Sequence, residues 1–248
     1  MNDTTDLGYL KNYLNDVKGI ILDYGGTLDT GGTHWSRVIW EAWQEAGVAT
    51  TLPVFREAYV YAERELARTS HILPQHDFHD LLNIKINIEL QWLAHQGEFP
   101  AGDVAPMAGK IASICNDAAS DNIKKTIPVL EDLAARYPIV LVSNFYGNIK
   151  KVLEQFGIAK YFKSIIESAV VGIRKPDPGI FSLGVKALDF RADECVVVGD
   201  SYDKDMQPAH EAGCKAVWLK GAGWSGEEDL REYPATINSL EELRDALL

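Results

Sequence analysis

The chain has little of what marks secreted or membrane proteins. Its 248 residues include only three cysteines, Cys115, Cys195 and Cys214, and no two of them form a Cys-x-x-Cys motif. We expect them to be buried thiols in a reducing compartment. No apolar run approaches the roughly 20 residues that span a membrane. Residues 1–6 are acidic and lack a basic region before an apolar core, so we expect no signal peptide and a cytoplasmic protein.

Basic residues are also in short supply. The chain has 24 Lys and Arg against 36 Asp and Glu, which gives a net charge of -12. This surplus disfavours general binding to nucleic acid or to an anionic membrane. A small phosphorylated ligand can still bind, because a local cation and a few basic side chains outweigh a distant average. The length suits one large domain, or one core with an inserted module.

Strand patterns occur in two parts of the chain, a short one near the start and a long one after residue 122. An apolar run over residues 17–22 predicts a first strand that ends at Asp23. Beyond residue 122, helical and strand patterns alternate, with helices expected over 126–136, 148–156, 178–188 and 204–212 and strands over 139–142, 162–166, 195–198 and 216–219. Alternation of this kind predicts an α/β fold: a doubly wound, Rossmann-like parallel sheet with helices on both faces.

The stretch between these two parts has only helical patterns. Expected helices run from Trp35 to a stop at Gly47, from Pro53 onward, from Phe78 to about Gly97, and over residues 104–119. We therefore divide the chain into a core of residues 1–29 and 123–248 and an inserted all-helical module of residues 30–122.

Polar side chains recur where the predicted strands end. Asp23 follows the first strand, Ser143 and Asn144 follow a second, and Asp200 follows a later one, with Lys175 between them in the sequence. Ligands bind at the carboxyl ends of the strands in open parallel sheets. Several such residues together predict a functional site at this edge.

These residue types suit phosphoryl transfer, which needs a nucleophile, charge neutralisation and a fixed geometry. Asp23 can form an aspartyl-phosphate. Asp23 and Asp200 offer the hard oxygen ligands that Mg²⁺ prefers, and the Gly25 carbonyl can complete the site. Asp205 fits a supporting role, holding a metal-bound water or Lys175.

The order of these residues resembles the motifs of the haloacid dehalogenase-like hydrolases. Asp23-Tyr24-Gly25-Gly26-Thr27-Leu28 resembles their motif I, Asp-x-Asp-x-Thr-Leu, and the other three motifs are matched by Ser143-Asn144, by Lys175 and by Gly199-Asp200 with Asp205. The inserted module takes the place of the family's helical cap. The resemblance implies that Asp23 is the nucleophile, that Ser143, Asn144 and Lys175 hold the phosphoryl group, and that Asp23, Gly25, Asp200 and Asp205 form the Mg²⁺ site. The cap then selects the substrate, a small phosphorylated metabolite.

One family residue is missing, because the second aspartate of motif I falls on Gly25. In the family's phosphatases that carboxylate protonates the leaving alcohol and then activates water, help worth roughly 10²–10⁴-fold. Tyr24 cannot replace it, since neighbouring side chains on a strand point in opposite directions. The family's dehalogenases lack the acids of motif IV, which are present here, so dehalogenation is not expected.

Three functions fit this pattern. The first, which we favour because the other motif positions are intact, is a Mg²⁺-dependent phosphatase or phosphotransferase that is slow or restricted to good leaving groups. The second is a phosphonatase-like hydrolase, which would need Lys85 or Lys110 of the cap to form a Schiff base. The third is a catalytically silent protein that binds phosphate or a partner.

Two further groups in the cap are better explained by structure than by chemistry. His71, His76, His79 and Asp80 do not share a helical face, so we favour a polar loop over a metal site. The tryptophans Trp35, Trp40 and Trp43 are expected to form mostly the core of the cap, with one ring free to line the substrate cleft.

Overall fold

A computed structural model describes residues 6–248, so the first five residues of the acidic start lie outside it. Within this range the chain forms six strands, β1 (Gly19–Leu22), β2 (Ile139–Ser143), β3 (Ser164–Glu167), β4 (Cys195–Gly199), β5 (Lys215–Leu219) and β6 (Thr236–Ile237). All are parallel, in the order β3-β2-β1-β4-β5-β6. The predicted doubly wound parallel sheet is confirmed. The short β6 was not predicted.

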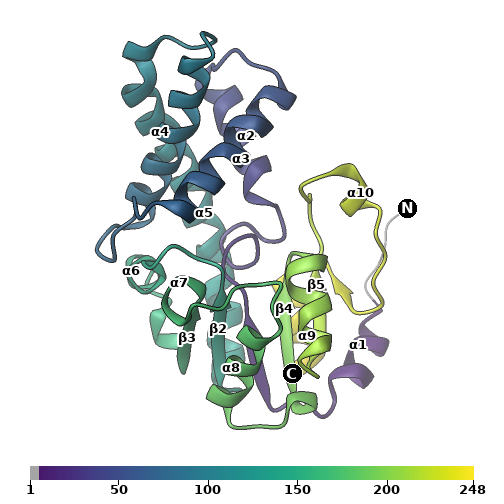
Figure 1. Ribbon diagram of the computed structural model, residues 1–248. Coiled ribbons are helices and arrows are strands. Elements are labelled where there is room, and N and C mark those ends of the chain that lie inside the picture. The colour runs from purple at the N-terminus through teal and green to yellow at the C-terminus, as the bar shows by residue number, and fades with distance from the viewer. Residues whose placement is uncertain (1–5) are drawn as a thin grey trace.

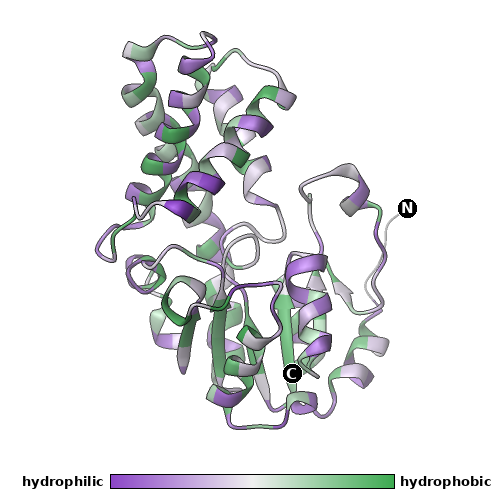
Figure 2. Ribbon diagram, in the orientation of Figure 1, coloured by the Kyte–Doolittle hydropathy of each residue, from purple (hydrophilic) through white to green (hydrophobic). Residues whose placement is uncertain are grey.

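Helices cover both faces of the sheet. The α-helices of the described residues are α1 (Leu7–Leu14), α2 (Trp35–Ala46), α3 (Leu52–Arg68), α4 (Phe78–His95), α5 (Val104–Ala134), α6 (Ile149–Gln155), α7 (Ser168–Val171), α8 (Gly179–Leu188), α9 (Gln207–Glu211), α10 (Gly226–Asp229) and α11 (Leu240–Leu247). On one face, residues of α8 and α9 pack with Ile21 and Val197. On the other face, residues of α1, α5 and α11 pack with Ile20 and Val196. The central strands are therefore apolar on both sides, as the continuous green of Figure 2 shows.

The register of the central strands brings the predicted site residues to one edge. Leu22 of β1 lies opposite Leu141 of β2 and Val198 of β4. Asp23 thus emerges at the middle of the carboxyl edge, between the ends of β2 and β4. Helices α2, α3 and α4 lie beyond this edge as a separate all-helical body, at the top of Figure 1.

The long helix α5 joins the helical body to the core. The sequence predicted two helices here, over 104–119 and 126–136, but the structure has one continuous helix of 31 residues. The prediction was wrong because the polar stretch between them contains no glycine or proline, and Pro128 does not break the helix. Its first half packs against α2 and α4 and its second half meets α11. We propose the same division of the chain at residues 29 and 122, with α5 shared by both parts.

The predicted ends of the cap helices have clear local causes. Helix α2 ends at Gly47, which has a φ of 90° and donates to the last carbonyls. Helix α4 begins after Asp77, whose side chain accepts from the Asp80 amide in a capping box. Despite the length of α5, no helix within residues 6–248 is long and apolar enough to cross a membrane.

Candidate active site

The residues predicted from the strand ends line a single cavity between the sheet edge and the helical body. Its volume is about 590 Å³. From the core it is lined by Asp23, Gly25, Ser143, Asn144, Lys175, Asp200 and Asp205. Residues of α3 and α4 close it from the other side. All the predicted site residues are therefore brought together in space.

Lys175 is the buried cation of the site. Its Nζ lies 2.8 Å from Asp23 Oδ1 and 2.6 Å from Asp205 Oδ1, and the residue is only 4% exposed. Burial lowers the pKa of the lysine, but the two carboxylates outweigh burial and raise it above its ordinary value. Lys175 stays charged and fixes the orientation of Asp23.

Asn144 and Ser143 lie side by side but differ in what they can do. The Asn144 amide donates to the Lys175 carbonyl (3.0 Å), and its oxygen accepts from the Lys175 backbone N–H (2.9 Å). Its side chain was expected to hold substrate, yet it holds the loop that carries Lys175. The Ser143 hydroxyl lines the cavity and has no hydrogen-bond partner among residues 6–248. Ser143 is therefore available to a ligand.

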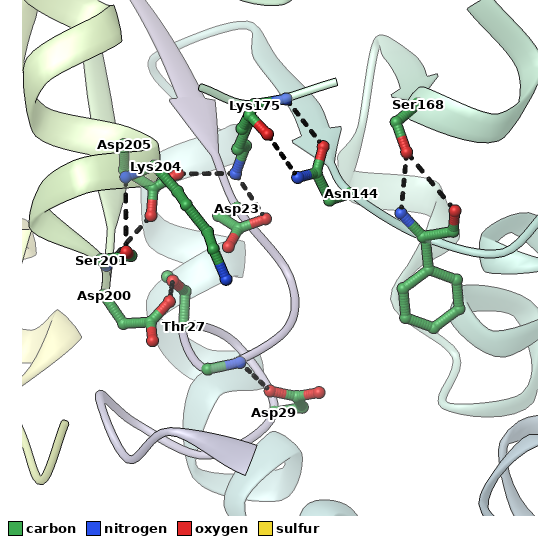
Figure 3. A network of polar contacts seen from close by, with 12 residues as sticks. Asp23, Thr27, Asp29, Asn144, Ser168, Lys175, Asp200, Ser201, Lys204 and Asp205 are labelled. Carbon is green, nitrogen blue, oxygen red and sulfur yellow. Dashed lines mark hydrogen bonds and ion pairs between the residues drawn. The ribbon is translucent and has the colours of Figure 1, made fainter. Parts of the chain in front are cut away.

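The site has more buried negative charge than Lys175 can balance. Oxygens of Asp23, Asp200 and Asp205 lie within 4.8 Å of one another (Figure 3). Burial raises the pKa of Asp200 well above its ordinary range, and the neighbouring Asp205 and Asp23 add to this. Burial also raises the pKa of Asp205, although Lys175 opposes it. A divalent cation would relieve this repulsion.

The donors in this cluster fit magnesium. Both oxygens of Asp205 are engaged, one with Lys175 and the other with the Ser201 backbone N–H at 3.1 Å. Asp205 therefore supports the site rather than offering a free ligand. Asp23 and Asp200 keep an oxygen available, and the Gly25 carbonyl accepts no hydrogen bond within residues 6–248. Carboxylate and carbonyl oxygens are the ligands that Mg²⁺ prefers.

The two glycines of the turn after Asp23 are not equivalent. Gly26 has a φ of 94°, and a Cβ there would lie 2.3 Å from Asp200 Oδ2. Glycine is required at this position because Asp200 occupies the space of any side chain. A Cβ on Gly25 would meet nothing nearer than Trp35 Cδ1 at 3.8 Å, an ordinary contact. The missing side chain at Gly25 is therefore not demanded by the backbone.

Two polar residues of the site were missed by the sequence analysis. Asp29 is buried and accepts from the Gly26 backbone N–H (2.8 Å) and from Trp35 Nε1 (2.9 Å), so it fixes the turn. Burial raises its pKa to about 8. Lys204 extends its amine toward Asp23 and Asp200 in Figure 3 and lines the cavity. Neither residue has a local sequence signal, since both positions depend on the turns that carry them.

The remaining predicted groups make contacts of their own within the cap, although His71 also lines the cavity. His71 contacts Glu65, His76 accepts from the Leu73 backbone, and His79 contacts Ser113. Among residues 6–248, Asp23, Asp200 and Asp205 are the only three acidic, histidine or cysteine side chains close enough together to hold a metal ion. Trp40 and Trp43 pack on Phe55 in the cap, whereas Trp35 also lines the cavity.

Comparison with known proteins identifies the family. Residues 17–213 match the family model of the haloacid dehalogenase-like hydrolases, and the chain belongs to this family. A glyceraldehyde 3-phosphate phosphatase of Methanocaldococcus jannaschii is 39% identical over 93 residues, which are 38% of this chain and 41% of that protein. The chain thus spans less than half the length of that relative.

Two matches cover most of the chain, one in sequence and one in fold alone. A ribulose-1,5-bisphosphate 5-phosphatase of Halopiger xanaduensis is 27% identical over 213 residues, covering 82% of this chain and 86% of that protein. The structure of the hydrolase YfnB from Bacillus subtilis, bound to magnesium, is similar in fold with a TM-score of 0.58 at 18% identity. That similarity covers 93% of this chain and 98% of YfnB.

Proposed function

We propose that the chain is a Mg²⁺-dependent phosphohydrolase that acts on a small phosphorylated metabolite through Asp23. The observation that carries the proposal is the buried contact between Asp23 and Lys175, beside Asp200 and in a cavity that the Ser143 hydroxyl also lines. The relatives named as phosphatases support the same activity.

In the first step an oxygen of Asp23 attacks phosphorus, and the bond from phosphorus to the alcohol oxygen breaks. Lys175 orients the attacking carboxylate, and Ser143 donates to a phosphoryl oxygen. Water then attacks the phosphorus of the aspartyl-phosphate, which releases phosphate and restores the carboxylate. Mg²⁺ held by Asp23, Asp200 and the Gly25 carbonyl would neutralise charge on the phosphoryl group.

Both steps lack the acid/base that the family's phosphatases use. The leaving alkoxide needs a proton and the water needs a base, and Gly25 supplies neither. The nearest polar atom to its side-chain position is Trp35 Nε1, which already donates to Asp29. The proposed enzyme is therefore slow, or it acts on esters with a good leaving group or with their own acid.

The phosphonatase alternative is disfavoured by the state of the cap lysines. A Schiff base needs a neutral amine, but Lys85 forms an ion pair with Glu63 and lies over the Tyr59 ring. Burial lowers the pKa of Lys85, yet Glu63 outweighs burial and raises it well above its ordinary value. Lys110 donates to the Ala46 carbonyl in the cap.

Phosphate release from a panel of phosphorylated metabolites, measured with and without Mg²⁺, tests the proposal. The panel includes glyceraldehyde 3-phosphate, phosphoserine, phosphoglycolate and ribulose 1,5-bisphosphate. We expect Mg²⁺-dependent release that is lost in Asp200→Asn together with Mg²⁺ affinity by calorimetry. Asp203→Asn is the matched control, because Asp203 is exposed and pairs with Arg231. A rate of phosphate release that does not depend on Mg²⁺, or equal Mg²⁺ affinity in both variants, would contradict the metal assignment.

We also propose that the enzyme works in the cytoplasm. Cys115, Cys195 and Cys214 are all free and buried, which suits a reducing compartment. Its ligand is a small molecule, and the negative net charge argues against nucleic acid or a membrane as a partner.

A further inference from the structure

A charged pair, of which Lys85 is the buried member, lies at the cap end of the cavity. Glu63 of α3 forms an ion pair with Lys85 of α4, and the Lys85 amine lies 4.1 Å from the centre of the Tyr59 ring. Tyr146, from the loop after β2, donates its hydroxyl to Glu63 Oε1 at 3.1 Å. The catalytic step described above uses none of these groups.

Both members of this pair line the cavity, and the acidic one is far more exposed. The Glu63 side chain is 37% accessible, whereas that of Lys85 is 5% accessible. Burial raises the pKa of Glu63, but Lys85 and Tyr146 outweigh burial and bring it below its ordinary value. His34, which also lines the cavity, is kept neutral because burial lowers its pKa to about 3. The surface offered to a ligand is an ionised carboxylate, which accepts hydrogen bonds and donates none.

This carboxylate lines the same cavity as Asp23 and Ser143. Tyr146, which contacts Glu63, is three residues beyond Ser143, so their Cα atoms are at most about 11 Å apart. The rings of Trp35, Phe78 and Tyr59 line the same cavity and give apolar walls for a short carbon chain. A phosphoryl group at Asp23 therefore places the far end of a small ester toward Glu63.

We propose that Glu63 determines specificity, selecting phosphate esters whose alcohol part ends in a hydrogen-bond donor, a hydroxyl or an amine, and rejecting those that end in a carboxylate. This inference rests on the proposed phosphohydrolase function. A terminal hydroxyl or ammonium donates to Glu63, while a terminal carboxylate meets like charge and finds no donor there. The cavity also holds other basic side chains. Arg68 is paired with Glu65, whereas Lys204 enters from the core and, with Lys85, lowers the pKa of Glu63, so the carboxylate ester is the decisive arm of the test.

The test is a set of phosphate esters that share one carbon chain and differ in the terminal group: hydroxyl, amine, carboxylate or methyl. The set is repeated at increasing chain lengths, with Mg²⁺ present. Hydrogen bonds to a charged group contribute about 1.5–3 kcal/mol, so we expect kcat/KM to favour the donor esters over the carboxylate ester by roughly 10- to 100-fold, mainly through KM. The hydroxyl and amine arms distinguish a polyol from an amino alcohol as the natural ligand.

Glu63→Gln should reduce this preference and improve the carboxylate ester. Glu57→Gln, an exposed carboxylate on the same helix and outside the cavity, should keep the wild-type preference. If Glu63→Gln misfolds because Lys85 loses its partner, the double variant Glu63→Gln/Lys85→Met removes both charges and is expected to show the same loss.

The outcomes separate this inference from the proposed function. Equal rates for all terminal groups, or a preference for the carboxylate ester, in an enzyme that hydrolyses the methyl ester would overturn the role of Glu63 and leave the phosphohydrolase intact. No hydrolysis of any ester or of an aryl phosphate would refute the phosphohydrolase, and the specificity role with it.

Discussion

Restoring the missing carboxylate by Gly25→Asp probes the site most sharply. The backbone at Gly25 lies outside the left-handed region, and a Cβ there makes only ordinary contacts, 3.8 Å to Trp35 Cδ1 and 4.0 Å to Trp35 Nε1. The new side chain therefore meets no steric obstacle, and bound Mg²⁺ would offset the negative charge that it adds to the cluster. Gly26→Ala provides a contrast, because its Cβ would collide with Asp200.

A positioned acid/base contributes roughly 10²–10⁴-fold, so Gly25→Asp should raise kcat/KM within that range, less any misplacement of the new side chain. For p-nitrophenyl phosphate, whose leaving group needs little protonation, the gain falls on hydrolysis of the aspartyl-phosphate. For alkyl phosphates the substitution should accelerate both steps, so the gain in kcat/KM should be larger. The assay is phosphate release under saturating Mg²⁺ with both substrate types.

Gly25→Asn is the matched control, since it has nearly the same shape and cannot transfer a proton in this way. We expect no comparable gain from it. Equal rates for the parent, Asp and Asn proteins, with folding and Mg²⁺ affinity unchanged, would mean that the site serves another reaction or none. The phosphonatase-like and silent-binding interpretations would then be preferred.

Two other substitutions test the structure around the site. Asn144→Ala removes two hydrogen bonds to the Lys175 backbone, each contributing about 1 kcal/mol. We expect kcat to fall roughly 10-fold or more, while the Mg²⁺ affinity measured by calorimetry is retained. A loss of Mg²⁺ affinity with kcat intact would contradict this role of Asn144. Glu89 is fully buried with both oxygens unpaired, and burial raises its pKa from about 4.5 to about 8 although Lys85 opposes this and Glu63 reinforces it. The folded state holds the proton that the unfolded state loses, so wild-type stability should fall as pH rises from 4.5 to 8. Glu89→Gln should lack this fall and be the more stable by up to about 4 kcal/mol at pH 8 in urea unfolding. A difference in unfolding free energy between wild type and Glu89→Gln that does not change with pH would contradict the raised pKa of Glu89.

The sequence was most informative where function depends on local order along the chain. Asp23, Ser143 and Asp200 each follow a short apolar run, and parallel pairing of those runs is enough to bring them to one edge. Helix boundaries with a specific cap, such as Asp77 or Gly47, were also predictable. The continuous helix α5 was missed: the polar residues after position 119 resemble a linker, although they include no glycine or proline that would end a helix.

Contacts between segments that are distant in the chain could not be predicted from the sequence. Asn144 is a plausible ligand residue in the motif, but its side chain is engaged by a loop 31 residues away. Glu63 and Lys85 are separated by 22 residues and look like ordinary charges of two amphipathic helices. Their pairing inside the cavity depends on how α3 and α4 pack over the core.

The central claim, that Asp23 accepts the phosphoryl group, is tested most directly by mass spectrometry of the protein quenched in acid during turnover of an aryl phosphate with Mg²⁺. Because Gly25 provides no base for the second step, the aspartyl-phosphate should accumulate. We expect the wild-type protein to gain the mass of one phosphoryl group, mapped to the peptide that contains Asp23, and the Asp23→Asn variant to gain none. Steady phosphate release with an unmodified Asp23 peptide, or an undiminished rate in Asp23→Asn, would contradict the account.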